Sequence, residues 1–306
     1  TALFQTLVNG DHVIIGRNTY GGTYRMAVDV LSKHGFEFDF VDTRFLDQVK
    51  DSIKPNTKWI FVETPTNPML ELCDLKKMAK LSKDHNIKLV VDNTFMSPYG
   101  QSPLSLGADV VIHSATKYIG GHSDLIGGVL ITNNKSISEE LYFIQKSAGA
   151  VPSPFDCWML LRSTKTMGLR VQKQSDNAME LAKRLEPIIG VDSIIYPGLE
   201  NHPQHQLAKQ QQLSPLGDPI YGSIISIKLG TVKARDKFLS KIQLFTLAES
   251  LGGVESLVCI PYGMTHGSVP NEIKTDMGLT EDLIRLSVGI EHIEDLYNDI
   301  IQAIEK

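Results

Sequence analysis

The strongest constraint on the fold is a series of six short, nearly continuous apolar runs that alternate with helix-like segments. The runs are HVIIG, FEFDFV, WIFVE, IKLVVD, DVVIHS and GGVLIT. Between them lie segments such as TYRMAVDVLSKHG and DLKKMAKLSKDHN, whose apolar residues recur at helical spacing. Strands that are buried on both faces of a parallel sheet are apolar throughout. The alternation therefore predicts an α/β fold with a mostly parallel sheet and helices on both faces.

The second half of the chain has a different pattern. A long helix is expected over residues 162–186, and it is followed by IIYPGL, GSIISIKL and LFTLAESL. A closing helix carries one apolar stripe, formed by Ile293, Leu296, Ile300 and Ile304. With 306 residues the chain can form two domains. We predict a large domain over 1–163 and a smaller C-terminal α+β domain over 164–306, joined by the long helix.

Composition excludes several classes of protein. The net charge of -5 gives no basic footprint for nucleic acid, and no apolar run reaches the roughly 18 residues that span a bilayer. The N-terminus lacks the basic flank and apolar centre of a signal peptide. The cysteines Cys73, Cys157 and Cys259 are odd in number and far apart, which predicts reduced thiols in a cytoplasmic protein. We expect no metal site, because the pair His202 and His205 has no third ligand nearby in the sequence.

The first residues, TALFQTLV, have the pattern of the middle of a helix. Leu3, Phe4, Leu7 and Val8 are apolar at helical spacing, and no capping residue precedes them. We therefore expect the chain as given to lack its N-terminal part.

Polar residues follow three of the predicted strands. Glu63 ends WIFVE and precedes TPTNP, Asp92 ends LVVD, and Lys117 lies in HSATK after VVI. In open α/β sheets, ligands bind beyond the carboxyl ends of the strands, so these residues should meet at one edge. The sequence has no phosphate-binding GxxxxGK loop.

Pyridoxal 5'-phosphate requires this combination of groups. It needs a lysine that forms a Schiff base, a carboxylate that keeps its ring nitrogen protonated, and donors for its phosphate. Lys117, Asp92, and the hydroxyls of Ser114 and Thr116 supply these in turn. A lysine that is desolvated at a strand end also has the lowered pKa that its role demands. The alternatives are a surface lysine and an aspartate that only caps a turn.

The motifs resemble those of the Cys/Met-metabolism family of pyridoxal-phosphate enzymes. The matching segments are SATKYIGGHSD around Lys117, YGGTYR, ETPTNP, VVDNTF, AESLGGVESL and IRLSVGIE. They occur in the family's order and cover essentially the whole chain. The family includes cystathionine γ-lyases, cystathionine γ-synthases and methionine γ-lyases. Four segments, VVDNTFMSPY, GAVPSPFDC, YPGLENHPQH and LFTLAESLGG, are most similar to the γ-lyases.

The resemblance implies a role for each cofactor residue. Lys117 matches the Schiff-base lysine, Asp92 the partner of the ring nitrogen, and Ser114 and Thr116 the phosphate ligands. Tyr20 matches the tyrosine that stacks on the ring and can take part in proton transfer. In ETPTNP, Asn67 matches a residue that hydrogen-bonds near the phenolic oxygen of the ring, and Glu63 shapes that loop. The alternative for Tyr20 and for TPTNP is an ordinary turn.

The resemblance also implies the substrate residues. Arg285 matches the arginine that holds the α-carboxylate, and Ser250 lies in a loop that touches the same group. Glu249 occupies a position associated with selectivity for the far end of the substrate. The alternatives are an ion pair between Arg285 and Asp282 and a solvated glutamate at position 249.

The resemblance implies a function as well as a fold. The fold is that of fold-type I pyridoxal-phosphate enzymes, with a seven-stranded type of sheet. The activity is γ-elimination on L-cystathionine, which gives cysteine, 2-oxobutanoate and ammonia, in a homotetramer whose sites are shared between subunits. The alternatives are a γ-replacement transferase, a methionine γ-lyase and a truncated chain without activity. The family's N-terminal arm and phosphate-binding turn have no counterpart in this sequence.

Overall fold

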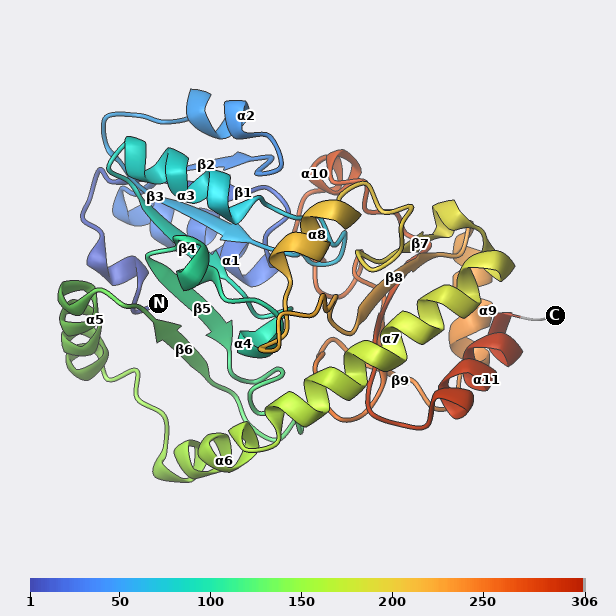
Figure 1. Ribbon diagram of the computed structural model, residues 1–306. Helices are drawn as coiled ribbons and strands as arrows, with labels where there is room; N and C mark the ends of the chain where they lie inside the picture. The colour runs from blue at the N-terminus through green and yellow to red at the C-terminus, as the bar shows by residue number, and fades with distance from the viewer. Residues whose placement is uncertain (305–306) are drawn as a thin grey trace.

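Each of the six apolar runs forms one strand of a single sheet in the computed structural model, which describes residues 1–304 (Figure 1). The strands are β1 (His12–Gly16), β2 (Glu37–Val41), β3 (Thr57–Glu63), β4 (Lys88–Asp92), β5 (Val110–Ser114) and β6 (Gly128–Ile131). Their order is β2-β1-β3-β4-β5-β6; the first five are parallel and β6 is antiparallel to β5. The α/β prediction is confirmed. The described sheet has six strands rather than seven, because the sequence supplies six apolar runs and each makes one strand.

Helices and short turns connect these strands. They are α1 (Gly21–Arg25), α2 (Leu46–Asp51), α3 (Leu75–Asp84), α4 (Ser97–Gly100), α5 (Lys135–Ala148), the 3-10 turns Phe4–Thr6, Leu31–His34 and Pro103–Leu106, and the π-turn Met26–Val30. The segment TYRMAVDVLSKHG is helical, as its pattern predicts, but it is divided into α1, one turn of π-helix and a 3-10 turn. The β-branched Val28 and Val30 lower its helix propensity.

The expectation of a helix at the N-terminus is also wrong. Only Phe4–Thr6 forms a 3-10 turn. Phe4 is buried against the first sheet, with its ring centroid 5.6 Å from that of Trp59. Burial of this aromatic side chain therefore fixes the segment more strongly than local helical periodicity does.

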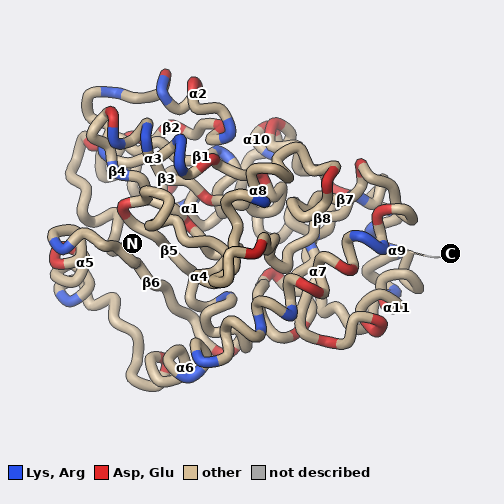
Figure 2. The backbone as a smooth tube through the Cα atoms, viewed as in Figure 1, with Lys and Arg blue, Asp and Glu red and all other residues tan. Residues whose placement is uncertain are grey.

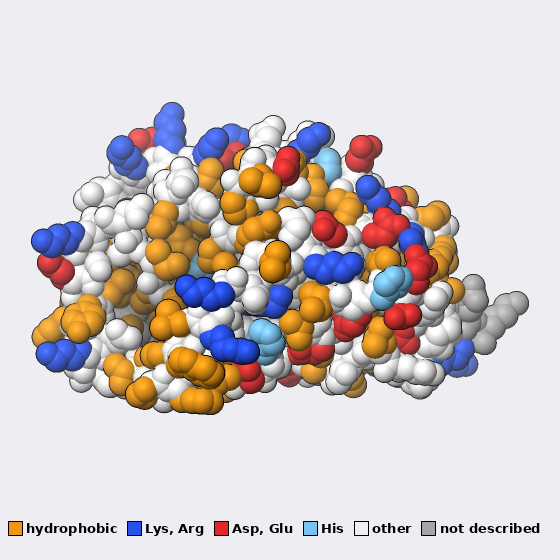
Figure 3. Space-filling model, turned by 60° about the horizontal axis from the view of Figure 1, so that its bottom comes forward, with side chains coloured by type: hydrophobic (Ala, Val, Ile, Leu, Met, Phe, Trp, Pro, Cys, Tyr) orange, Lys and Arg blue, Asp and Glu red, His pale blue; other side chains and the backbone are white. Residues whose placement is uncertain are grey.

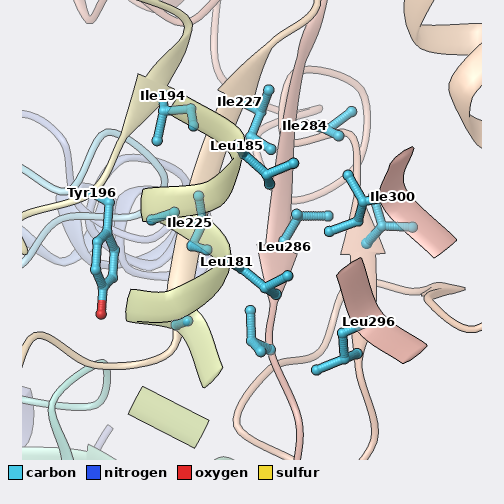
Figure 4. Packing of buried hydrophobic residues seen from close by; sticks show 14 of the residues in the cluster. Leu181, Leu185, Ile194, Tyr196, Ile225, Ile227, Ile284, Leu286, Leu296 and Ile300 are labelled. Atoms are coloured by element: carbon cyan, nitrogen blue, oxygen red, sulfur yellow. The ribbon is translucent and has the colours of Figure 1, made fainter. Parts of the chain in front are cut away.

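A second sheet lies on the other side of the molecule (Figure 1). Its strands are β7 (Ile194–Ile195), β8 (Ile224–Lys228), β9 (Thr246–Leu247), β10 (Leu257–Cys259) and β11 (Leu283–Ser287), in the order β7-β8-β11-β10-β9. The helices of this half are α8 (His205–Gln211), α9 (Val232–Lys241), α10 (Asn271–Asp276) and α11 (Ile293–Ile304), with a 3-10 turn at Val191–Ser193. Leu296 and Ile300 of the predicted stripe are buried and pack with Ile284 and Leu286 of the sheet (Figure 4).

A long helix connects the two halves, although it starts later than predicted. α6 (Pro154–Thr164) is followed by a break at Thr166, and α7 (Met167–Ile189) then runs from the first sheet to the second (Figure 1). Ser153 caps the N-terminus of α6, because its hydroxyl accepts a hydrogen bond from the Asp156 amide. The division into domains 1–163 and 164–306 stays a prediction.

Charged side chains lie on the outer helices. α3 contains several lysines (Figure 2), which are exposed, while its Leu75 and Met78 are buried. None of the helices among residues 1–304 combines the length and apolarity needed to cross a membrane.

Candidate active site

Lys117 lies in the turn that follows β5, and its amine faces the second half of the chain. The Nζ atom is 3.3 Å from the Ser250 hydroxyl, which lies in the loop before β10. Burial, together with the nearby positive charge of Arg285, lowers the pKa of the Lys117 amine. Desolvation disfavours the charged form, so a larger fraction of this amine is neutral and able to react than in an exposed lysine.

Two acid groups end neighbouring parallel strands. Glu63 of β3 and Asp92 of β4 are paired in register. Burial and the adjacent Asp92 raise the pKa of Glu63 to about 8, and burial raises the pKa of Asp92 as well. Burial makes ionisation of Asp92 unfavourable. A cation beside Asp92 would offset this penalty, because it would stabilise the ionised carboxylate.

Glu63 connects two parts of the site through its two oxygens. Oε2 accepts a hydrogen bond from the Tyr20 amide and Oε1 accepts one from the Asn67 amide, both at 2.9 Å. Glu63 therefore holds the start of the Tyr20 loop and the TPTNP loop at the same strand end. The Tyr20 side chain itself is 47% exposed, so one side of it is open to a ligand.

Arg285 reaches the site from β11. Nη1 donates to the Asn67 side-chain oxygen at 2.9 Å, and Nη2 donates to the backbone oxygens of Glu249 and Ser250 at 2.7 and 3.1 Å. The Nε atom is buried and has no hydrogen-bond partner among residues 1–304. The alternative of an ion pair with Asp282 is wrong, since Asp282 instead accepts the Gly230 amide. A guanidinium fixed on three sides, with a donor unsatisfied, suits a planar carboxylate.

Of the remaining predicted residues, Ser114 and Thr116 lie at the end of the first sheet and Glu249 lies in the loop after β9. The Ser114 amide donates to the Thr94 hydroxyl at 2.8 Å, and the Thr116 hydroxyl accepts the Gly127 amide at 3.0 Å. Both residues are partly exposed at the end of β5. Glu249 points its side chain toward solvent and contacts Arg285 through its backbone oxygen.

Sequence reasoning missed two residues of this region. The Thr94 amide donates a hydrogen bond to Asp92 at 3.0 Å, and the Thr94 hydroxyl accepts one from the Ser114 amide. Thr94 therefore connects two predicted cofactor residues. The Asp-x-Thr spacing is a turn signal that could have revealed it. His266 is fully buried, and burial together with Arg285 lowers its pKa to about 4, so it is neutral near the site. Nothing in its sequence surroundings indicates this position.

These residues fit pyridoxal 5'-phosphate. Lys117 offers a desolvated amine, and the raised pKa of Asp92 shows a carboxyl group that would gain from a protonated ring nitrogen. Ser114 and Thr116 place hydroxyl groups beside Lys117 in the sequence and remain partly accessible. A lysine, an acid and hydroxyl donors at one strand edge are the groups that this cofactor needs.

Comparison with known proteins gives the same assignment. The family model for Cys/Met metabolism PLP-dependent enzymes matches residues 1–305. The chain belongs to this family. A cystathionine gamma-lyase of Bacillus subtilis is 49% identical over 305 residues, which are 100% of this chain and 79% of that protein. A cystathionine beta-lyase of Lactococcus lactis subsp. cremoris is 46% identical with the same coverage.

The fold of the family is confirmed by a solved structure. The cystathionine gamma-lyase from Lactobacillus plantarum, complexed with L-serine, superposes with a TM-score of 0.94 at 42% identity. The match covers 99% of this chain and 78% of that one. Pyridoxal 5'-phosphate is therefore the cofactor, and the chain is an enzyme of sulfur amino-acid metabolism. Relatives named for different reactions are similar to a comparable degree, so the specific reaction is a separate question.

Proposed function

We propose that the chain catalyses γ-elimination on L-cystathionine, which with one water gives cysteine, 2-oxobutanoate and ammonia. The observation that carries the proposal is the approach of the Lys117 amine to Ser250, beside the partly unsatisfied Arg285 fork. This arrangement suits an α-amino acid whose α-proton faces the lysine. The γ-lyase motifs in the sequence favour this reaction over the alternatives.

Arg285 would hold the substrate α-carboxylate. Its fork can make two parallel charge-assisted hydrogen bonds, which fix the amino acid in one orientation. Asn67, Glu249 and Ser250 restrain the guanidinium through the bonds described above. The guanidinium is therefore ordered before the substrate binds, and a carboxylate that takes two of its donors would replace some of these hydrogen bonds.

Lys117 would move the protons. The bound cofactor supplies an electron-withdrawing ring that stabilises negative charge at the carbon atoms of the substrate. The Lys117 amine, with its lowered pKa, accepts the α-proton as a general base. Elimination also needs a proton removed from Cβ and one donated to the leaving thiolate. One amine accepts one proton at a time, so Lys117 would have to release the α-proton before it accepts the proton from Cβ. Its ammonium form, or the Tyr20 hydroxyl, would then protonate the leaving thiolate.

The specific reaction has close competitors. A β-elimination on the same substrate would release homocysteine and pyruvate, and the similarity to beta-lyases makes it the leading alternative. A γ-replacement transferase would need an O-acylated homoserine and a thiol, and a methionine γ-lyase would release methanethiol from methionine. Incubation of the holoenzyme with each substrate separately tests these alternatives, and faster turnover of methionine or of the homoserine ester would contradict the proposal.

We also propose that the chain acts as a homo-oligomer, with a tetramer as the family suggests. Large apolar side chains are exposed on α5 and α6, among them Phe143, Phe155 and Trp158 at 68%, 66% and 57%. Hydrophobic side chains are numerous at the lower left of the surface in Figure 3. A patch of this kind marks a protein interface. Light scattering on the purified chain tests the assembly, and a monomer at micromolar concentration would contradict it.

The free thiols support a reducing, cytoplasmic setting.

A further inference from the structure

Arg170 is a buried cation that the reaction described above does not use. It lies in the first turn of α7 and is 6% exposed. Nη1 donates to the backbone oxygen of Tyr118 at 2.9 Å, and Nη2 to those of Ser163 at 3.0 Å and Ile119 at 3.4 Å. None of the ion pairs found within residues 1–304 includes it. Because a cation is unfavourable at a helix N-terminus, these carbonyl groups must stabilise it.

The loop after Lys117 lies directly on this guanidinium. A Cβ atom placed on Gly121 would be 1.9 Å from Arg170 Nη1. Gly121 also has φ of +70°, which favours glycine. A side chain at position 121 would therefore force the Arg170 guanidinium to move, so the chain immediately after Lys117 packs tightly against Arg170.

Gln174, one helical turn further along α7, holds a second loop. Its amide nitrogen donates to the backbone oxygen of Gly253, and the side chain is fully buried. Gly253 follows Ser250 in the loop before β10. The two loops are also joined directly, since the Val254 amide donates to the Gly121 oxygen at 3.0 Å. Residues four apart on a helix share one face, so one face of α7 contacts both loops.

We propose that Arg170 and Gln174, the α7 pair, are positioning residues that set the separation between Lys117 and Ser250. Each loop carries one member of the 3.3 Å contact, and each is tied to the same face of one helix. The inference rests on the proposed role of Lys117. It adds that α7, which connects the two halves, keeps the reacting amine in place beside the substrate-binding loop.

Hydrogen exchange on the cofactor-free protein tests the positioning directly. The variants are Arg170→Met, Arg170→Lys and Gln174→Met, and Lys173→Met is the control because Lys173 is exposed on the same helix. Loss of a buried hydrogen bond should speed exchange of the 118–122 or 250–254 amides by about tenfold. Arg170→Lys should restore part of the protection, and the control should match the parent. Unchanged exchange in both loops in the methionine variants would overturn the proposal.

A second measurement separates positioning from a merely structural role. Turnover is normalised to bound cofactor, so a smaller folded fraction does not lower it. A displacement of about 1 Å at the reacting group should lower kcat by about 10²-fold. In Arg170→Met the KM should stay near the parent value, because Arg285 is untouched. An unchanged kcat per bound cofactor in Gln174→Met and Arg170→Lys would overturn the proposal even if Arg170→Met fails to fold. If the parent itself shows no turnover, the proposed function fails, whereas the exchange result still decides the positioning.

Discussion

Replacement of Arg285 by lysine should weaken substrate binding by a predictable amount. Lysine keeps the positive charge but loses the planar fork, so one of two charge-assisted hydrogen bonds to the carboxylate disappears. Such a bond contributes about 2 kcal/mol, which corresponds to roughly a 30-fold rise in KM. The lysine would also leave at least one of the groups that Arg285 now serves, Asn67 Oδ1 and the two backbone oxygens, without its donor.

Steady-state kinetics with L-cystathionine measures this change. Arg184→Lys is the matched control, because Arg184 binds Glu180 and Glu294 on the outer side of α7 and lysine can keep an ion pair there. A substrate analogue with an α-carboxamide gives a double-mutant cycle. The analogue should bind weakly to the parent and lose little more in the variant, since both changes remove the same interaction. A KM for Arg285→Lys within about threefold of the parent would refute the assignment of Arg285 as the carboxylate ligand, since a lost charge-assisted bond costs more than that.

Three further predictions concern the first sheet. Lys117→Ala should remove turnover altogether while the chain still folds, and turnover that survives would refute the assignment of the proton transfers to Lys117. Tyr20→Phe should lower kcat by about 10- to 100-fold if the hydroxyl is the acid for the leaving group, with little change in cofactor affinity; an unchanged kcat assigns that step to Lys117. The pKa of Glu63, raised to about 8 in the folded state, means that its contribution to stability is complete below about pH 4.5 and is lost as the pH rises toward 8. The cofactor-free Glu63→Gln variant should therefore gain stability relative to the parent between pH 5 and 8 in urea unfolding, and parallel pH profiles would contradict this.

The sequence was informative where burial alone determines structure. All six strands of the first sheet are recognisable because they are apolar on both faces, and their polar ends predict that Glu63 and Asp92 lie side by side, as their pairing in register shows. The closing helix was equally clear, since Leu296 and Ile300 lie on one buried stripe. These features depend on periodicity within a few residues.

The parts that were missed depend on contacts distant in the sequence. Phe4 is held by Trp59, so the N-terminal segment does not follow its own helical pattern. Arg170 and Gln174 contact loops about 50 and 79 residues away, and no local pattern distinguishes them from other polar residues of α7. The hydrogen bond between Arg285 and Asn67 joins residues 218 positions apart, so the resemblance predicted two roles without predicting that the side chains touch.

The most direct test of the proposed reaction is the ratio of two keto acids. The holoenzyme is incubated with L-cystathionine, and 2-oxobutanoate and pyruvate are separated and quantified over time, together with cysteine and homocysteine. We expect 2-oxobutanoate and cysteine to form in equal amounts, with pyruvate a minor product. Pyruvate and homocysteine as the main products would contradict γ-elimination and assign the chain to β-elimination. Absence of both keto acids, in a protein that binds pyridoxal 5'-phosphate, would contradict a lyase acting on this substrate.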